Sequence, residues 1–296
     1  MGIFSFYLDG HKIAEAHNII TDRGKAVIGN YLSEERSSWA NFLVIGSGQS
    51  QPLASDLSLD LEFWREPIDL KTYSFDQGEL VVRGTIPGSV VGKIYEIGVY
   101  SSTSPTAVSS SGPTICYFDT SIEDWSAGAD EVVEARVGSK SLKLTSPGSS
   151  SSSSFRFFGD LRSYNKDSIF KLGYLSSGAT SSISVRIKSS SENYREYTFT
   201  PDNSSQYSVE EWSLSDFSIV GSANIFEFFD IEILIDGAGS VIFDVLSVLD
   251  QQLQDFSDVL VSRALVNSGP GFISKLPSRE LQIEYSIDLS SGGSGE

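Results

Sequence analysis

The sequence has very few of the side chains on which most hydrolases and metalloproteins depend. Its 296 residues include one cysteine, Cys116, and two histidines, His11 and His17. A lone cysteine excludes an internal disulfide, and its apolar neighbours in ICYF predict a buried core thiol. On one extended strand the two histidines would lie about 20 Å apart at ~3.3 Å per residue, and no third histidine or second cysteine completes a zinc site. No G-x-S-x-G motif is present, so a catalytic constellation is not expected.

Positive charge and long apolar runs are also scarce. Lys and Arg number 21 against 39 Asp and Glu, which gives a net charge of −18. A duplex-binding protein needs basic side chains to neutralise phosphates, so we expect no nucleic-acid partner. No apolar run approaches the ~18 residues of a membrane span, so we expect no membrane insertion. Gly46-Ser47-Gly48 follows an apolar run, but it lacks the glycine spacing and the Lys-Ser/Thr of a phosphate loop.

What the chain does contain is typical of many short strands. Serine, glycine and aromatic residues are plentiful, and charged residues make up only 20%. One helix is predicted from Thr21 or Asp22 to Leu32, where apolar residues recur at helical spacing after a capping side chain. The predicted fold class is therefore mainly β: a discontinuous β-sandwich domain with one short helix, plus an inserted antiparallel jelly-roll sandwich.

The discontinuity is inferred from two segments that lie far apart in the chain. The segment 92–100, GKIYEIGVY, alternates as a packed strand does and is followed by a Ser/Pro-rich stretch. The segment 281–289, LQIEYSIDL, has one apolar and one polar face, which requires a sheet to join. We therefore predict that segment 92–100 is an interior strand whose sheet is completed by the last part of the chain. The predicted domains are 1–112 with 253–290, an insert at 115–250, and a flexible tail at 291–296.

The insert itself is almost wholly strand-like. Ten short apolar-alternating segments fill it, and turn signals such as Asp202-Asn203 and Asp236-Gly237 are expected to separate several of them. A change of phase between Phe228 and Phe229 predicts a bulge. The serine run 149–154 is expected to be a loop or a solvated edge.

The segments outside the insert resemble the N-terminal domains of bacteriophage tail-collar and tail-fibre proteins. The resemblance rests on the order of short motifs and covers about residues 18–100 and 258–289. The matching residues are Thr21, Gly24, Ala26 and Ile28; Ile45, Gly46 and Gly48; Leu61, Glu62 and Arg65; Ile86 and Pro87; Glu96 to Tyr100; Leu260 to Ala264; Ile273 to Lys275; and Leu281 to Leu289. It implies a virion protein that docks onto other virion proteins and copies of itself.

The insert resembles a carbohydrate-binding-module jelly roll. The residues that carry this resemblance are Phe118-Asp119 with Trp125, the segment VGSKSLKL at 137–144, and IFDVLSVL at 242–249. In such modules an early acidic residue and an aspartate of the last strand often hold a structural calcium. The resemblance therefore implies a metal site at Asp119 and Asp244, although two carboxylates alone underspecify calcium.

Sugar binding needs aromatic rings beside hydrogen-bonding groups on a solvated surface. The candidates are Trp125, Tyr194, Tyr197 and Trp212, with Tyr194 in the most polar segment, SSSENYREY. The alternative for Trp125 and Trp212 is that both fill the sandwich core.

Paired carboxylates could also make a glycosidase. Glu210-Glu211 and Glu123-Asp124 are adjacent in sequence, so in a strand their side chains point to opposite faces, which disfavours a catalytic pair. A pair formed by carboxylates of different strands stays open as an alternative.

These observations lead to one functional hypothesis and its alternatives. The chain is predicted to be a non-enzymatic structural component of a bacteriophage virion, in the tail, collar, fibre or baseplate. Its split domain would dock, and its jelly roll would contact host surface glycans. The alternatives are a capsid decoration or head-fibre protein, a polysaccharide-binding module, or a depolymerase.

Overall fold

The computed structural model describes most of the chain: residues 2–74, 76, 78–102, 114–119, 123–131, 134–156, 168–223, 230–249, 258–266 and 271–288. The chain forms two compact units. The split unit consists of Met1–Gly112 and Leu253–Glu296, and the inserted unit consists of Pro113–Gln252. The predicted bulge at Phe228/Phe229, the Ser/Pro-rich stretch after Ser102 and the tail 291–296 lie outside the described residues. No described helix is long and apolar enough to cross a membrane.

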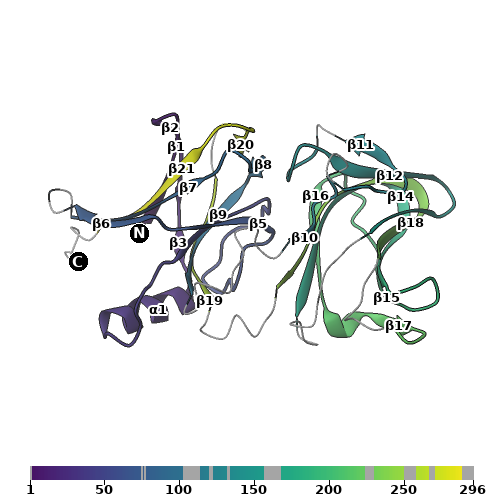
Figure 1. Cartoon of the computed structure of the whole chain (residues 1–296), viewed down its shortest axis with the longest axis horizontal. Helices are drawn as coiled ribbons and strands as arrows, with labels where there is room; N and C mark the ends of the chain where they lie inside the picture. The colour runs from purple at the N-terminus through teal and green to yellow at the C-terminus, as the bar shows by residue number, and fades with distance from the viewer. Residues whose placement is uncertain are drawn as a thin grey trace. The chain divides into compact units, whose positions relative to one another are not determined.

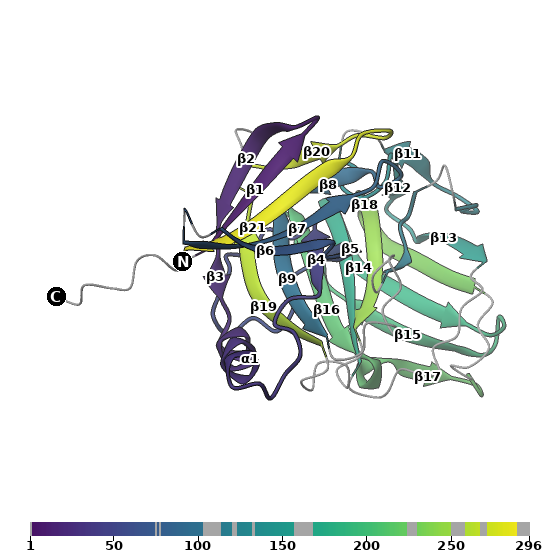
Figure 2. The ribbon, with the colours of Figure 1, turned by 60° about the vertical axis from the view of Figure 1, so that its left-hand side comes forward.

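The first sheet of the split unit is built around the last strand of the chain. Its order is β2 (His11–His17), β1 (Gly2–Leu8), β21 (Leu281–Asp288), β7 (Glu79–Ile86) and β6 (Leu70–Ser74), all antiparallel. Figure 2 shows β21 between β1 and β7. Leu281, Ile283 and Tyr285 of β21 are buried while the residues between them are half-buried, so the expected two-faced strand is present.

The second sheet of the split unit joins segments from both sides of the insert. Its order is β3 (Ile19–Ile20), β19 (Asp258–Leu265), β9 (Glu96–Ser102), β4 (Phe42–Gly46) and β5 (Glu62–Pro67). The predicted strand 92–100 is divided at Tyr95 into β8 (Gly92–Ile94) and β9, and β8 pairs with β20 (Ile273–Lys275). β9 is interior, as expected, but its late partner is β19, since the closing strand β21 completes the first sheet instead.

The predicted helix is present as α1 (Asp22–Leu32), and it lies beside β19 in Figure 2. Thr21 is its N-cap, and the Thr21 hydroxyl accepts the backbone N–H of Gly24 at 2.9 Å. A Cβ atom on Gly24 would lie 2.2 Å from the carbonyl oxygen of Val261. Glycine at position 24 therefore lets the helix approach the strand backbone closely.

The inserted unit is organised on two antiparallel strands of 20 residues each, β14 (Ile169–Lys188) and β18 (Asp230–Leu249) (Figure 1). The start of β14 also pairs with β16 (Tyr207–Ser213), and its end pairs with β15 (Tyr194–Phe199). The other elements are β10 (Thr114–Cys116), β11 (Ala129–Glu131), β12 (Ser141–Pro147), β13 (Ser151–Arg156), η1 (Leu214–Asp216) and β17 (Ser218–Val220). The serine run thus enters a strand, β13, which pairs with β18.

One expectation about the inserted unit is wrong. Asp236-Gly237 was expected to separate two strands, yet both residues lie inside β18. β14 likewise contains most of two segments, 168–176 and 183–190, that the sequence pattern predicts as separate strands. Gly178 and Gly237 adopt φ of +89° and +91°, and the ladder register shifts between Thr180 and Ser182, so the backbone bends without ending the strands. The mainly β, antiparallel fold class is confirmed.

Candidate functional site

Trp212 belongs to the core of the inserted unit and not to its surface. Its side chain is only 3% exposed. The indole ring stacks on Tyr197 at 4.6 Å between centroids and on Phe170 at 5.7 Å. A ring covered in this way offers no face to a sugar, so Trp212 is corrected from a binding residue to a core residue.

Trp125 lies at the margin of the same core. It is half-buried, and its ring stacks on Phe118 at 4.8 Å and meets Phe155 at 4.8 Å. The indole N–H donates to Glu123 Oε2 at 3.0 Å. Its polar atom is thus satisfied inside the unit, and its contacts are those of a packing residue.

Tyr197 faces inward from β15, opposite Val185. Its hydroxyl donates to Glu210 Oε1 at 2.8 Å, and burial together with this hydrogen bond raises the pKa of Tyr197. Glu211, the next residue after Glu210, pairs with Lys171 at 3.3 Å. The two adjacent glutamates thus have different partners, and Glu210 serves a packing contact.

Tyr194 is the one predicted aromatic residue on the outer face of the inserted unit. In the end of β14, Ile183, Val185 and Ile187 are buried, while the alternate residues are half-buried. Direct cross-strand partners share a face, and Tyr194 is opposite Lys188, one of the half-buried residues. The Tyr194 ring is half-buried, and the Arg186 guanidinium carbon lies 4.9 Å from its centroid.

We call this surface the outer face. It is formed by the outward residues of five neighbouring strand segments: Ser218 and Val220 of β17; Tyr194, Glu196 and Thr198 of β15; Ser184, Arg186 and Lys188 of β14; Asp230, Glu232 and Leu234 of β18; and Ser152, Ser154 and Arg156 of β13. Hydroxyl groups and charged groups dominate it. The hydroxyls of Ser184 and Thr198, for example, lie 2.7 Å apart.

Ion pairs run across the outer face from strand to strand. Arg186 Nε donates to Glu196 Oε1 at 2.6 Å, and Arg186 Nη1 donates to Glu232 Oε2 at 3.2 Å. Burial lowers the pKa of Arg186, but the hydrogen bonds to the two carboxylates outweigh burial and raise it. Lys188 pairs with the second oxygen of Glu232 at 3.3 Å. These charges were not among the predicted site residues, although the alternation in ISVRIK and YREYTF is a signal that they share one face.

Asp119 and Asp244, the predicted calcium ligands, both hold the turn at residues 136–139. Asp119 Oδ2 accepts the backbone N–H and the hydroxyl of Ser139 at 2.8 and 3.2 Å. Asp244 Oδ1 accepts the backbone N–H groups of Arg136 and Val137 at 3.0 and 3.2 Å. Burial raises the pKa of Asp244 to about 6 despite these hydrogen bonds.

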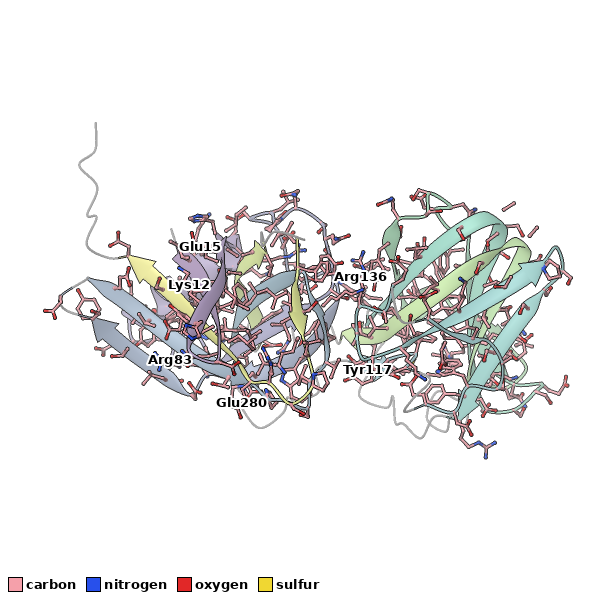
Figure 3. All side chains as sticks on the ribbon, turned by 90° about the horizontal axis from the view of Figure 1, so that it is seen from above. Lys12, Glu15, Arg83, Tyr117, Arg136 and Glu280 are labelled. Atoms are coloured by element: carbon pink, nitrogen blue, oxygen red, sulfur yellow. The ribbon has the colours of Figure 1, made fainter. Side chains whose placement is uncertain are left out.

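Both aspartates accept hydrogen bonds from protein groups, and these bonds use carboxylate oxygens that a cation would otherwise bind. Asp244 Oδ2 accepts the Tyr207 hydroxyl at 3.3 Å, and the Arg136 guanidinium carbon lies 3.6 Å from the Tyr207 ring centroid (Arg136 is labelled in Figure 3). Among the described residues, no group of three or more His, Cys, Asp or Glu side chains could hold a metal ion. The calcium site stays a prediction, and the hydrogen bonds assign both aspartates to the turn.

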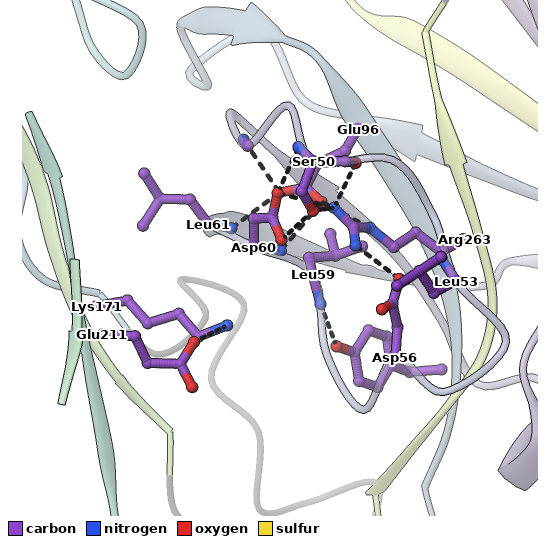
Figure 4. A network of polar contacts seen from close by, with 12 residues as sticks. Ser50, Leu53, Asp56, Leu59, Asp60, Leu61, Glu96, Lys171, Glu211 and Arg263 are labelled. Atoms are coloured by element: carbon purple, nitrogen blue, oxygen red, sulfur yellow. Dashed lines mark hydrogen bonds and ion pairs between the residues drawn. The ribbon is translucent and has the colours of Figure 1, made fainter. Parts of the chain in front are cut away.

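A second polar cluster, the Arg263 network, lies within the split unit (Figure 4). Arg263 of β19 pairs with Glu96 of β9 at 2.9 Å, with Asp56 at 2.7 Å and with Asp60 at 3.0 Å. Glu96 is fully buried, and its Oε1 also accepts the backbone N–H groups of Gly48 and Leu61 at 3.0 and 2.8 Å.

The Arg263 network explains why small residues occupy the Gly-Ser-Gly segment at positions 46–48. A Cβ atom on Gly46 or on Gly48 would lie 2.5 Å from Glu96 Oε1, so the small residues admit a carboxylate. Burial raises the pKa of Glu96, although the charge of Arg263 opposes the shift. Both carboxylate oxygens of Glu96 thus accept hydrogen bonds, and Glu96 acts as a structural residue.

The histidines lie at opposite ends of β2, where both are exposed. His11 is opposite Leu8 and His17 is opposite Ile3 in the ladder with β1. This placement keeps them apart, as the sequence predicts.

Comparison with known proteins gives no family. No family description and no curated protein matches the sequence. Among solved structures, a family 11 carbohydrate-binding module from Clostridium thermocellum in complex with a mixed-linked tetrasaccharide aligns at 16% identity and a TM-score of 0.34, over 43% of this chain and 86% of that one. A family 30 carbohydrate-binding module of a Clostridium thermocellum cellulase aligns at 10% identity and 0.35, over 56% and 95%.

A further similar structure is the enzymatically active domain of tailspike protein 4 of bacteriophage CBA120. It aligns at 13% identity and a TM-score of 0.28, over 43% of this chain and 18% of that one. At these identities and scores the comparisons assign neither a family nor a ligand.

Proposed function

We propose that this chain is a non-enzymatic structural component of a bacteriophage virion that binds host surface polysaccharide. The split unit attaches it to other virion proteins and to copies of itself, and the outer face of the inserted unit binds the sugar. The observation that carries the binding role is the position of Tyr194: an aromatic ring among hydroxyl and charged groups, on the strand face opposite to the one that holds the core residues Ile183 and Val185.

The outer face has the two kinds of group that sugar recognition requires. A pyranose ring packs its apolar C–H face on an aromatic ring and hydrogen-bonds its hydroxyls to fixed polar groups. Tyr194 supplies the ring, and Arg186 and Glu196 supply charged hydrogen-bonding groups in adjacent strands. Because these groups are on paired strands, their spacing is fixed before a ligand arrives.

The virion role is supported by the way in which the motif residues meet. Glu96 belongs to the E-I-G-V-Y motif and Arg263 to the L-V-S-R-A motif, and these residues are separated by 167 positions. They pair with one another, and Glu96 also holds the backbone after the Gly46–Gly48 motif. Residues from several of the motifs that carry the tail-collar resemblance therefore form one network, which is a physical reason for those motifs to occur together.

A non-enzymatic role is supported by the bonding of the carboxylates on the outer face. Glu196 and Glu232 both bind one guanidinium, that of Arg186. A glycosidase needs one carboxyl group protonated and the other free to attack or to activate water. A depolymerase would shorten the bound polysaccharide, so size-exclusion analysis after prolonged incubation distinguishes the two activities.

The sugar-binding role is tested with the full chain on a panel of immobilised polysaccharides and bacterial surface glycans. Tyr194→Ala removes the ring and is expected to cost about 1–2 kcal/mol, or about 5- to 30-fold in affinity. Tyr73→Ala, an exposed tyrosine of the split unit, is the matched control and should bind as the unaltered chain does. Equal loss in both variants, or binding by no glycan of the panel, contradicts the proposal.

The virion role is tested separately by mass spectrometry of particles purified from the phage that encodes the chain. We expect stoichiometric peptides from both units. Their absence from intact particles contradicts the virion role and leaves sugar binding to be judged on its own.

A further inference from the structure

Every described cation of the outer face is matched by a carboxylate. Arg186 binds Glu196 and Glu232, Lys188 binds Glu232, and Arg156 lies 3.5 Å from Asp230. The three basic groups and the three acidic groups cancel. A face that binds acidic sugars would instead present a guanidinium or ammonium group without such partners.

We propose that Glu196 and Glu232 determine charge specificity: by neutralising the charge of the Arg186 guanidinium, they make the outer face select uncharged polysaccharide over acidic polysaccharide. This inference rests on the proposed function, because it assumes that the outer face is where sugar binds. It adds the substrate class and names the residues that set it.

The ion-pair geometry of Arg186 explains the proposed charge specificity. A guanidinium binds a carboxylate through a planar fork of N–H donors, and the same fork fits the carboxylate of a uronic or sialic acid. In this protein, Nε and Nη1 already donate to Glu196 and Glu232 at 2.6 and 3.2 Å. An acidic sugar that approaches the remaining N–H groups of Arg186 therefore meets a guanidinium whose charge is already neutralised, and the two neighbouring carboxylates repel it.

The overall charge acts in the same direction. The chain carries a net charge of −18, so an anionic polymer is repelled before it reaches the outer face. A neutral sugar meets neither obstacle, because it carries no charge and because a carboxylate oxygen with two lone pairs can accept a sugar hydroxyl while it pairs with a cation. The pairing of Arg186 also keeps its guanidinium against the Tyr194 ring, at 4.9 Å.

The test replaces both carboxylates of the full chain, as Glu196→Gln with Glu232→Gln. The amides keep the shape of the side chains and leave Arg186 and Lys188 without their counter-charges. Retention on neutral polymers (mixed-linkage β-glucan, xyloglucan, β-1,4-galactan) and acidic ones (polygalacturonate, alginate, hyaluronate) is measured by affinity electrophoresis. The unaltered chain should be retained by neutral polymers alone, and the double variant should gain acidic-polymer affinity of about tenfold or more at low salt.

The matched control is Glu15→Gln with Glu284→Gln. These residues pair with Lys12 and Arg83 in the split unit, where the labels of Figure 3 mark Lys12, Glu15 and Arg83. The control has the same net charge as the test variant, so a gain in the test variant alone locates the effect on the outer face. Adding Arg186→Gln to the test variant should abolish most of the gain.

The possible results distinguish a failure of the charge-specificity inference from a failure of the proposed function. If the unaltered chain binds acidic polymers as well as neutral ones, or if test and control variants behave alike, the inference is wrong and the proposed function stands. If the unaltered chain binds none of the polymers and no glycan of the wider panel, the proposed function fails and the inference with it. If the double variant loses its circular-dichroism signature, Glu196→Gln alone replaces it and should show a smaller gain of the same sign.

Discussion

Replacement of Arg263 by methionine is expected to destabilise the split unit severely. The change leaves Glu96, which is fully buried, next to Asp60 without its cation. Breaking a buried ion pair by removal of one partner costs about 3–5 kcal/mol, a large part of the ~5–15 kcal/mol that stabilises a domain. With an m-value of about 2 kcal/mol/M, the urea midpoint should fall by about 1.5–2.5 M.

The assay is pulsed hydrogen exchange of the full chain across a urea series, read by mass spectrometry of peptides from β9 and β19. Peptides of the inserted unit report its separate transition. Arg83→Met is the control, because the Arg83–Glu284 pair is partly exposed and should be worth less than about 1 kcal/mol. Adding Glu96→Gln to Arg263→Met should restore part of the loss. A shift no larger than that of Arg83→Met refutes the account of the network as a buried, donor-satisfied cluster.

Two other predictions concern single positions. Gly24→Ala should destabilise the split unit by about 2 kcal/mol or more, since its Cβ meets the Val261 backbone, whereas Gly29→Ala, with no atom within 4 Å, should stabilise it by up to about 1 kcal/mol in thermal unfolding. Asp244 has a folded-state pKa of about 6 against 3.8, so its contribution to stability is fully present below pH 3.8 and is lost as the pH rises through about 6. The loss is about 3 kcal/mol, and with EDTA present the unfolding free energy of Asp244→Asn should lack this pH dependence; an identical pH profile in both proteins contradicts the shift.

Local patterns predicted the elements whose residues carry their own periodicity. α1 followed from the Thr21 cap and helical spacing, and β21 followed from strict alternation between Leu281 and Ile287. The long strands β14 and β18 did not follow, because a glycine that bends a strand and a glycine that ends one look alike in sequence.

The site was less accessible to sequence reasoning than the fold. The contact between Glu96 and Arg263 depends on how β9 pairs with β19. The inserted unit separates these two strands in the sequence, so no local pattern encodes their pairing. Trp212 and Tyr194 are both aromatic residues of strand segments, and only the register of the ladders separates the buried ring from the outward one. The charges around Tyr194 were visible as alternation, but the charges that pair with one another lie on three different strands, β14, β15 and β18.

The central claim is that the outer face of the inserted unit binds polysaccharide. Its most direct test is the affinity of the full chain for the glycans of the panel, measured beside Tyr194→Ala and Tyr73→Ala. The account predicts binding that falls about 5- to 30-fold in Tyr194→Ala and stays unchanged in Tyr73→Ala. Binding that is insensitive to Tyr194 would place the sugar elsewhere and contradict the account.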